Sequence, residues 1–272
     1  MRRTGRGART LLAALAVLLL GGTAGCSSTA DATTVHLPRY GTLTELVSAM
    51  ADRQRTEQSA RISLRGDVTG GASKLQFTGE GVLRGTGNDV SVKFTQVVTQ
   101  RGADPQETGF VVLPDAVYLL QPGQQKAARP WTKVDRTSAD PADQRLLALS
   151  STLVDSADPA RTLSRYADAT SITDTADDVI EGDPAVRYTI VVDLAKAAAQ
   201  QPDPAARAQL QQQVTAGLTT LTSNLWVDRD SRPVRTVVRQ ALPGIGTLSI
   251  MGSYRDWGRP VDIVAPPKAQ VR

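Results

Sequence analysis

The chain has 272 residues, of which 40% are hydrophobic and 4% aromatic, and its formal net charge is +4. Four arginines in the first 25 residues account for that charge, because the rest of the chain carries 27 basic and 27 acidic side chains. A neutral body without a basic patch argues against a nucleic-acid partner. Cys26 and His36 are the only cysteine and histidine, so we expect no zinc or iron site and no cofactor.

Residues 1–25 have the pattern of a secretory signal peptide. Four arginines precede the apolar run at residues 11–20, and small residues separate that run from Cys26. The run has about half the length of a membrane-spanning helix, so we do not expect a stable span. Thr23 to Cys26 resemble a bacterial lipobox, in which the cysteine receives diacylglycerol, although Thr23 replaces the usual leucine. The pattern predicts an exported protein anchored by a lipidated Cys26 to the outer face of the cytoplasmic membrane. The alternative is an ordinary signal peptide with a chance cysteine.

A flexible tether and a helix are predicted next. Residues 26–40 are rich in Ser, Thr and Ala and lack periodicity, which is typical of a linker. Thr42 and Glu45 then form a capping box, and they open an amphipathic helix of about 15 residues. The apolar side chains expected on its buried stripe are Leu43, Leu46, Val47 and Met50.

Strands dominate the rest of the first half. Alternating apolar and polar residues predict strands at residues 61–68, 73–84, 88–95, 109–113, 116–120 and 131–134. Glycine-rich turns separate the first three strands, and residues 96–108 form a polar break. This pattern predicts an antiparallel meander with one apolar and one polar face.

The second half mixes helices with strands. Leucine spacing predicts a helix at 145–154, and Asp-Pro pairs at Asp158 and Asp203 open two more. Turns at 181–184 and 229–232 separate further strands. Those strands are predicted at residues 185–193, 224–228, 233–241 and 247–256.

The order of the elements predicts one α+β domain at residues 41–267, with a tail at 268–272. Its large curved antiparallel sheet has a few helices over one face. No internal repeat and no long linker divides this region. We therefore expect a monomeric, single-domain body.

No catalytic constellation is evident. The single histidine lies in the tether, so a Ser-His-Asp arrangement cannot form in the body. Aspartate pairs at residues 177 and 178 and at residues 140 and 143 could act as paired carboxylates, so a hydrolase is an alternative. Glycines at 79 and 81 are better explained by a bend or bulge than by a phosphate loop. We expect a protein that is not an enzyme.

One face of the predicted sheet is apolar, and a curved sheet that is loosely covered would enclose a cavity there. A solid core would show the same alternation. The side chains expected to line a lipid cavity are Ile62, Leu64, Leu75, Phe77, Val90, Val92, Phe94, Val186, Tyr188, Ile190, Leu225, Val227, Val234, Val238, Leu248 and Ile250.

The C-terminal region resembles a known family. Residues 224–267 contain a "WVD" stretch, a hairpin and the closing pattern "SYRDWGRPVDIVAPP". These motifs, with the lipobox, the first helix and the meander, are similar to the LppX/LprA/LprF/LprG lipoproteins of actinobacteria. The matching residues are Tyr254, Asp256, Trp257, Gly258, Pro260, Val261, Ile263, Pro266 and Pro267.

The resemblance implies a half-barrel akin to the LolA/LolB carriers, with helices closing one side around a hydrophobic cavity. It also implies binding of acylated lipids or glycolipids and their transport to the outer envelope, in some cases with a membrane export protein. A membrane-anchored structural or signalling accessory protein with a filled core is the main alternative.

Overall fold

The computed structural model describes residues 37–70, 73–86, 89–242 and 246–272. The predicted signal peptide, Cys26 and most of the tether lie outside these ranges. Among the described residues, no helix combines the length and the hydropathy that crossing a bilayer would require.

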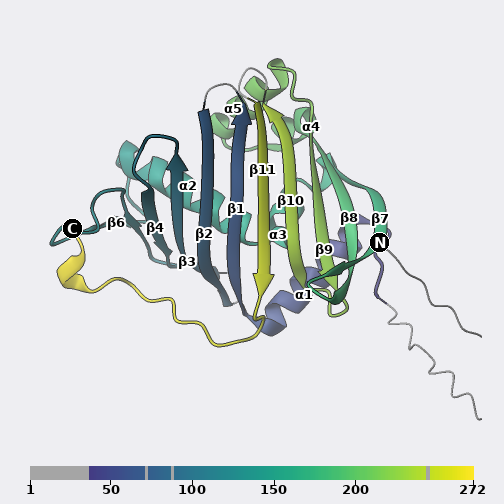
Figure 1. Ribbon diagram of the computed structural model, residues 1–272, viewed down its shortest axis with the longest axis horizontal. Coiled ribbons are helices and arrows are strands. Elements are labelled where there is room, and N and C mark those ends of the chain that lie inside the picture. Colours follow the sequence, from purple (N-terminus) through teal and green to yellow (C-terminus); the bar gives the residue numbers. More distant parts are fainter. Residues whose placement is uncertain (1–36, 71–72, 87–88, 243–245) are drawn as a thin grey trace, which may run out of the picture. The chain divides into compact units, whose positions relative to one another are not determined.

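Eleven antiparallel strands of the described residues form one open sheet, in the order β6-β5-β4-β3-β2-β1-β11-β10-β9-β8-β7 (Figure 1). The strands are β1 (Ser59–Gly70), β2 (Ser73–Thr86), β3 (Asp89–Gln100), β4 (Gln106–Val112), β5 (Ala116–Leu120), β6 (Trp131–Asp135), β7 (Thr170–Ile180), β8 (Asp183–Asp193), β9 (Thr220–Asp228), β10 (Pro233–Leu242) and β11 (Gly246–Arg255). Two meanders, β1–β6 and β7–β11, join because β1 pairs with β11. The edge strands β6 and β7 do not pair, so the sheet stays open.

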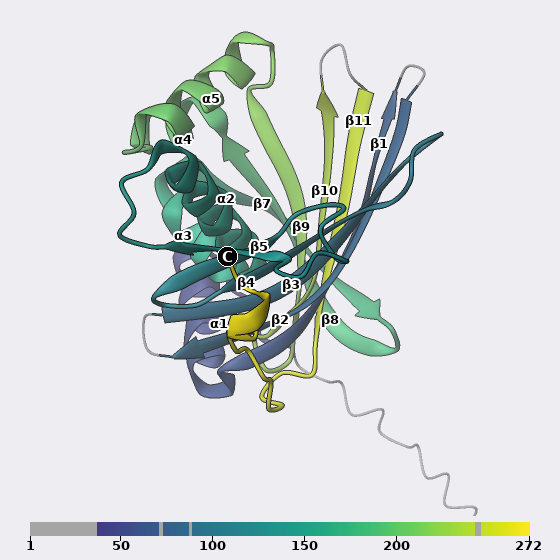
Figure 2. The same ribbon diagram turned by 90° about the vertical axis from the view of Figure 1, so that its left-hand side faces the viewer.

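Five α-helices of the described residues lie on one side of the sheet, inside its curve (Figure 2). They are α1 (Leu43–Glu57), α2 (Pro141–Ala157), α3 (Pro159–Arg165), α4 (Leu194–Gln200) and α5 (Pro204–Thr215). Helix α1 packs on α3, α2 packs on β3, β4 and β6, and α4 packs on α5 and β8. We call the helix-covered side the inner face and the opposite side the outer face. The predicted α+β class, with a large antiparallel sheet and helices over one face, is confirmed.

Short-range sequence signals place the helix starts. The Thr42 hydroxyl accepts from the Glu45 backbone amide at 3.2 Å, and the Glu45 carboxylate accepts from the Thr42 amide at 3.2 Å. This reciprocal pair is the predicted capping box, and α1 has the predicted 15 residues. Asp158 and Asp203 cap α3 and α5 through their side chains, each followed by proline as expected.

The polar break predicted at residues 96–108 is mostly strand. β3 continues to Gln100 and β4 begins at Gln106, so only a short turn separates them. The side chains in these strand ends are half-buried or exposed, which suits polar residues. Ladder hydrogen bonds between β3 and β4 hold this region in the sheet without an apolar repeat.

The last two residues of the segment that we predicted to be a tail run along the edge strand β6. Val271 forms a parallel bridge with Trp131, and the backbone of Arg272 exchanges hydrogen bonds with Trp131 and Lys133 at 2.9 and 3.0 Å. This segment follows a 3-10 helix at Lys268–Gln270. It occupies part of a sheet edge that would otherwise offer unpaired backbone groups.

Candidate functional site

Strand pairing decides which side chains share the inner face. Residues directly opposite each other in an antiparallel ladder point to the same side of the sheet. Leu64 lies opposite both Gly252 and Gly79, so these three residues share one face. Following the facing pairs from strand to strand assigns a face to each residue of the sheet. This assignment places the predicted cavity residues on the inner face with one exception. Val234 lies where the β9–β10 register shifts, and it lines a hollow on the outer face.

A packed cluster fills the inner face over β8 and β9. Its strand residues are almost fully buried and belong to the predicted cavity set. They pack against Leu46 and Met50 of α1 and Leu163 of α3, together with neighbouring apolar side chains. These strand residues are Val186, Tyr188, Ile190, Leu225 and Val227.

A second packed cluster fills the inner face on the other side of the sheet. Ile62, Val92 and Phe94 from the predicted set pack there with Val154 and Ala157 of α2. Val92 is completely buried, which leaves no free space beside its methyl groups for a ligand. Both flanks of the inner face are therefore covered by helices.

Between the two clusters, apolar side chains of the inner face are only half-buried. We call this group the inner strip: Leu64, Val68, Leu75, Val98, Val238, Leu248 and Ile250. β1 and β11 join the second cluster through Ile62 and Tyr254, but the strip side chains of these strands and of β10 are not buried to the same depth. Five of these seven residues belong to the set predicted from the sequence. Val68 and Val98 do not, and Val98 lies within the predicted polar break.

The two further members of the predicted set are Phe77, which lies outside both clusters, and Val90, which is partly buried against the second cluster. Phe77 is buried, with its ring beside Gly66. Val90 lines a hollow of about 270 Å³ near α1 and α3. A lining role in a lipid cavity stays a prediction for the whole set.

Three larger hollows open on the outer face, with volumes of about 620, 470 and 530 Å³. The inner strip lines none of these, nor the hollow near α1. The strip is thus an apolar surface separate from these hollows. The largest hollow is lined by arginines that come from three strands and two turns. Because these segments are far apart in the sequence, their grouping was not predicted.

The carboxylates considered for hydrolysis have structural partners. Asp178 accepts a hydrogen bond from the Trp226 indole at 2.8 Å, and this bond lowers the pKa of the Asp178 carboxyl. Asp140 accepts from the backbone amide of Ala142 at 2.7 Å, at the start of α2. Over the described residues, no group of three or more His, Cys, Asp or Glu side chains could hold a metal ion.

The C-terminal motif closes one end of the sheet. The Tyr254 and Trp257 rings stack with centroids 6.2 Å apart, and the Trp257 indole donates to the Pro233 carbonyl at 3.0 Å. Gly258 has a φ of +75° and donates its amide to Ser59 at 3.0 Å. Burial raises the pKa of Tyr254, so its hydroxyl is neutral at physiological pH. The motif therefore has a structural role, because it ties the end of β11 to the starts of β1 and β10.

Comparisons with known proteins give no family assignment. No family model matches the chain, and no curated protein matches it. Among solved structures, the Pseudomonas aeruginosa MucA/MucB complex is 13% identical with a TM-score of 0.33, covering 78% of this chain and 55% of that chain. The chain thus spans just over half of that structure's length.

Two other solved structures match over most of their own length. A LolA superfamily protein from Nitrosomonas europaea is 10% identical with a TM-score of 0.31, covering 82% of this chain and 96% of that chain. A putative outer membrane lipoprotein-sorting protein domain from Vibrio parahaemolyticus is 8% identical with a TM-score of 0.28, covering 79% and 90%. Likenesses this distant carry no argument about function.

Proposed function

We propose that the chain is an exported carrier that shelters the acyl chains of a lipid or glycolipid against its inner strip. The observation that supports this proposal is the half-buried apolar surface between two packed clusters. Soluble proteins rarely leave a contiguous apolar patch uncovered unless it binds a partner or a ligand. Aliphatic Leu, Ile and Val side chains suit an acyl chain, which needs contact and exclusion of water.

The energetics of such a carrier are simple. Each buried CH₂ group contributes about 0.8 kcal/mol in any apolar setting, so an acyl chain moves from bilayer to protein at little net cost. The protein only has to shield the chain from water during the passage. Transfer of this kind breaks no covalent bond, so the proposal includes no enzymatic step and no cofactor.

The finer assignments belong to the same proposal. We infer a relative of the actinobacterial LppX/LprG lipoproteins, held at the membrane by acyl chains on Cys26. A membrane lipid exporter would be its partner, and the body would act as a monomer without nucleic acid. These assignments rest on the lipobox and on the C-terminal pattern of the sequence.

A membrane-anchored accessory protein without a ligand is the second candidate. The dense packing of both flanks favours it, because many residues predicted to line a cavity lie in filled clusters. In that case a partner protein, and not a lipid, would cover the inner strip.

Two substitutions on neighbouring residues of β10 distinguish the candidates. Val238 belongs to the inner strip, whereas Val237 lines a hollow on the outer face. We expect Val238→Trp to copurify with several-fold less lipid than the wild type, because the indole occupies the surface of the strip. Val237→Trp should retain its lipid. Native mass spectrometry of protein purified from its own host measures the difference.

Thermal melting serves as the stability check for both variants, and we expect both to melt close to the wild type. Equal lipid content in the two variants would place the ligand elsewhere. Absence of lipid from the wild type itself would overturn the carrier proposal and favour the accessory protein.

A further inference from the structure

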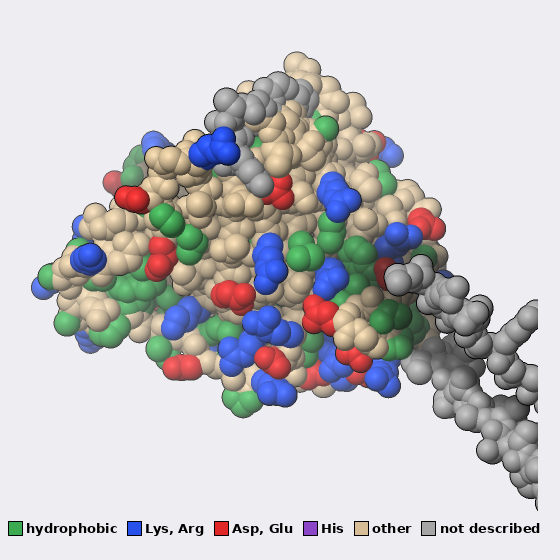
Figure 3. All heavy atoms as spheres, viewed as in Figure 1, with side chains coloured by type: hydrophobic (Ala, Val, Ile, Leu, Met, Phe, Trp, Pro, Cys, Tyr) green, Lys and Arg blue, Asp and Glu red, His purple; other side chains and the backbone are tan. Residues whose placement is uncertain are grey.

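The outer face of the sheet is charged, in contrast to the inner face, except over β4 and β5, where Val111 and Tyr118 pack with Ile263 of the C-terminal segment. In the view of Figure 3 this face is turned to the reader, and Lys, Arg, Asp and Glu side chains mix over its lower half. The hollow of about 620 Å³ lies here, between β1, β10 and β11 and the turns that join β7 to β8 and β9 to β10. Its lining contains six arginines and four carboxylates.

Two serines on adjacent strands form the floor of this hollow. Ser63 of β1 lies directly opposite Ser253 of β11, and Arg235 of β10 lies opposite Ser253 in the same row. Adjacent strands lie about 4.8 Å apart, so the two hydroxyl groups are close neighbours. The small serine side chains leave space above the sheet between longer arginine side chains.

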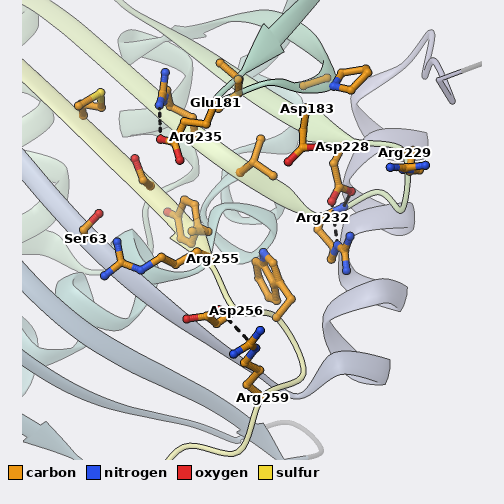
Figure 4. A pocket seen from close by; sticks show the side chains of 18 of the residues that line it. Ser63, Glu181, Asp183, Asp228, Arg229, Arg232, Arg235, Arg255, Asp256 and Arg259 are labelled. Carbon is orange, nitrogen blue, oxygen red and sulfur yellow. Dashed lines mark hydrogen bonds and ion pairs between the residues drawn. The ribbon is translucent and has the colours of Figure 1, made fainter. Parts of the chain in front are cut away.

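Two more arginines flank the serines along the strands. Arg65 follows Ser63 by two residues on β1, and Arg255 follows Ser253 by two residues on β11, so all of them point outward. Figure 4 shows Ser63 beside Arg255, with Arg235 paired to Glu181. We call this arrangement the serine–arginine hollow: Ser63, Arg65, Arg235, Ser253 and Arg255.

Several donors of this hollow are available to a ligand. Arg65 makes no hydrogen bond or ion pair within the described part of the chain, and the same holds for the Ser63 and Ser253 hydroxyls. Arg255 contacts Glu80 at 3.3 Å, with both side chains more than half exposed. Exposed pairs of this kind are weak in water, so a stronger anion can displace them.

Three other arginines of the lining are already paired. Arg235 contacts Glu181 at 2.9 Å, Arg232 contacts Asp228 at 2.8 Å, and Arg259 contacts Asp256 at 3.4 Å. Arg65, Arg229 and Asp183 have no ion pair among the described residues, so the unpaired charges of the lining are more cationic than anionic. An anion rather than a cation suits this balance.

We propose that the serine–arginine hollow binds a phosphate group. A phosphate ester offers several oxygens, which can accept from a guanidinium in bidentate fashion and from the serine hydroxyls at the same time. A single carboxylate has only two oxygens and would leave donors unused. The hollow is larger than one phosphate, and its volume is in the range that accommodates a phosphorylated headgroup or a sugar phosphate.

The site is independent of the proposed acyl-chain surface. Arg65 and Leu64 are consecutive on β1, so their side chains point to opposite faces of the sheet. A phosphate could come from a lipid headgroup of the membrane or from a soluble phosphorylated compound. The same donors would recognise either source.

Glycerol 1-phosphate is the soluble probe, and isothermal titration calorimetry of the folded protein at low salt is the measurement. We expect saturable binding that Arg65→Gln weakens about tenfold or more, since a hydrogen bond to a charged group contributes about 1.5–3 kcal/mol. Ser253→Ala should weaken it by a smaller factor. Arg101→Gln is the matched control, because Arg101 is an exposed arginine in the turn between β3 and β4. It removes the same charge and should leave binding unchanged.

Vesicle cosedimentation separates the two sources of phosphate. Binding to phosphatidylglycerol vesicles but not to phosphatidylcholine vesicles, lost in Arg65→Gln, would assign a lipid headgroup. Binding of glycerol 1-phosphate alone would assign a soluble compound. If Arg65→Gln and Arg101→Gln weakened binding equally, the effect would come from the net charge of the protein and not from the hollow. That result would overturn the site. No saturable binding of either probe would overturn it as well, whatever the lipid content of the inner strip.

Discussion

Individual glycines on the inner face make room for aromatic rings. Gly79 and Gly81 lie in a continuous ladder between β1 and β3, where the sequence suggested a bend or bulge. A Cβ atom added at Gly79 would overlap the Phe94 ring, and one at Gly81 would lie 2.5 Å from the Lys93 carbonyl oxygen and 2.6 Å from the Cδ2 atom of Phe94. The close approach of β3, and not an unusual φ, therefore requires glycine at these positions.

This arrangement predicts the effect of adding one methyl group. Gly79→Ala should lower the free energy of unfolding by about 1–3 kcal/mol, because the Phe94 ring has to move within a packed cluster. Gly85→Ala, on the same strand and face, is the control, since nothing lies within 4 Å of its added Cβ atom. Urea denaturation of the two variants measures both values. Equal stability would mean that the Phe94 ring moves at no cost.

Alternation along a strand predicted the face of a side chain but not how deeply it is buried. Val92 and Val238 were placed on the same face from the same pattern, and the ladders confirm that placement. Val92 is fully buried under α2, whereas Val238 is half-buried because no helix packs extensively on β10. Helix position depends on contacts between distant segments, which a period-two pattern does not contain.

At the scale of elements, strong local sequence signals were sufficient to predict where a helix begins. Elements with weak local signals were not predicted. The capping box and the Asp-Pro pairs located the starts of α1, α3 and α5. Strand β7 was not predicted, because an edge strand with one exposed face carries few apolar residues. Helix α4 was not predicted either, since its seven residues are too few to show a helical repeat.

The cap of α3 makes stability depend on pH. Asp158 accepts a hydrogen bond from the Arg161 amide at 3.1 Å, yet burial raises the pKa of its carboxyl above the ordinary value. The folded state therefore holds this proton more tightly than the unfolded state. The protonated Asp158 carboxyl therefore stabilises the folded state. This stabilisation is complete at a pH below the pKa of the carboxyl in the unfolded chain, and it is lost as the pH rises through the pKa of the carboxyl in the folded protein.

Asp158→Asn tests this dependence, because asparagine caps a helix as well as aspartate and does not ionise. We expect the variant to melt above the wild type at neutral pH and to lose this advantage as the pH falls below 4. Asp203→Asn on α5 is the control, since Asp203 caps a helix in the same way at an exposed position. Melting curves across this pH range give the comparison. A constant difference at every pH would show that Asp158 ionises normally in the folded protein.

At the scale of the whole described body, the sheet presents two chemically distinct faces. The sequence predicted an apolar face and a polar face, but not the order of the strands. Pairing of β1 with β11 joins residues almost 200 positions apart and brings Ser63 opposite Ser253. The serine–arginine hollow depends on that pairing, so no local motif could have revealed it.

The proposed anchor predicts where the protein is found in the cell. Cys26 lies eleven residues before Leu37, the first described residue, which allows a reach of up to about 40 Å from a membrane. One acyl chain gives only marginal attachment, whereas two or three hold a protein firmly. Cys26→Ala should therefore release the protein into the medium, while Ser27→Ala should leave it in the membrane fraction. Fractionation followed by intact-mass analysis is the measurement. A Cys26→Ala variant that stays in the membrane, with no added lipid mass on the wild type, would contradict the anchor.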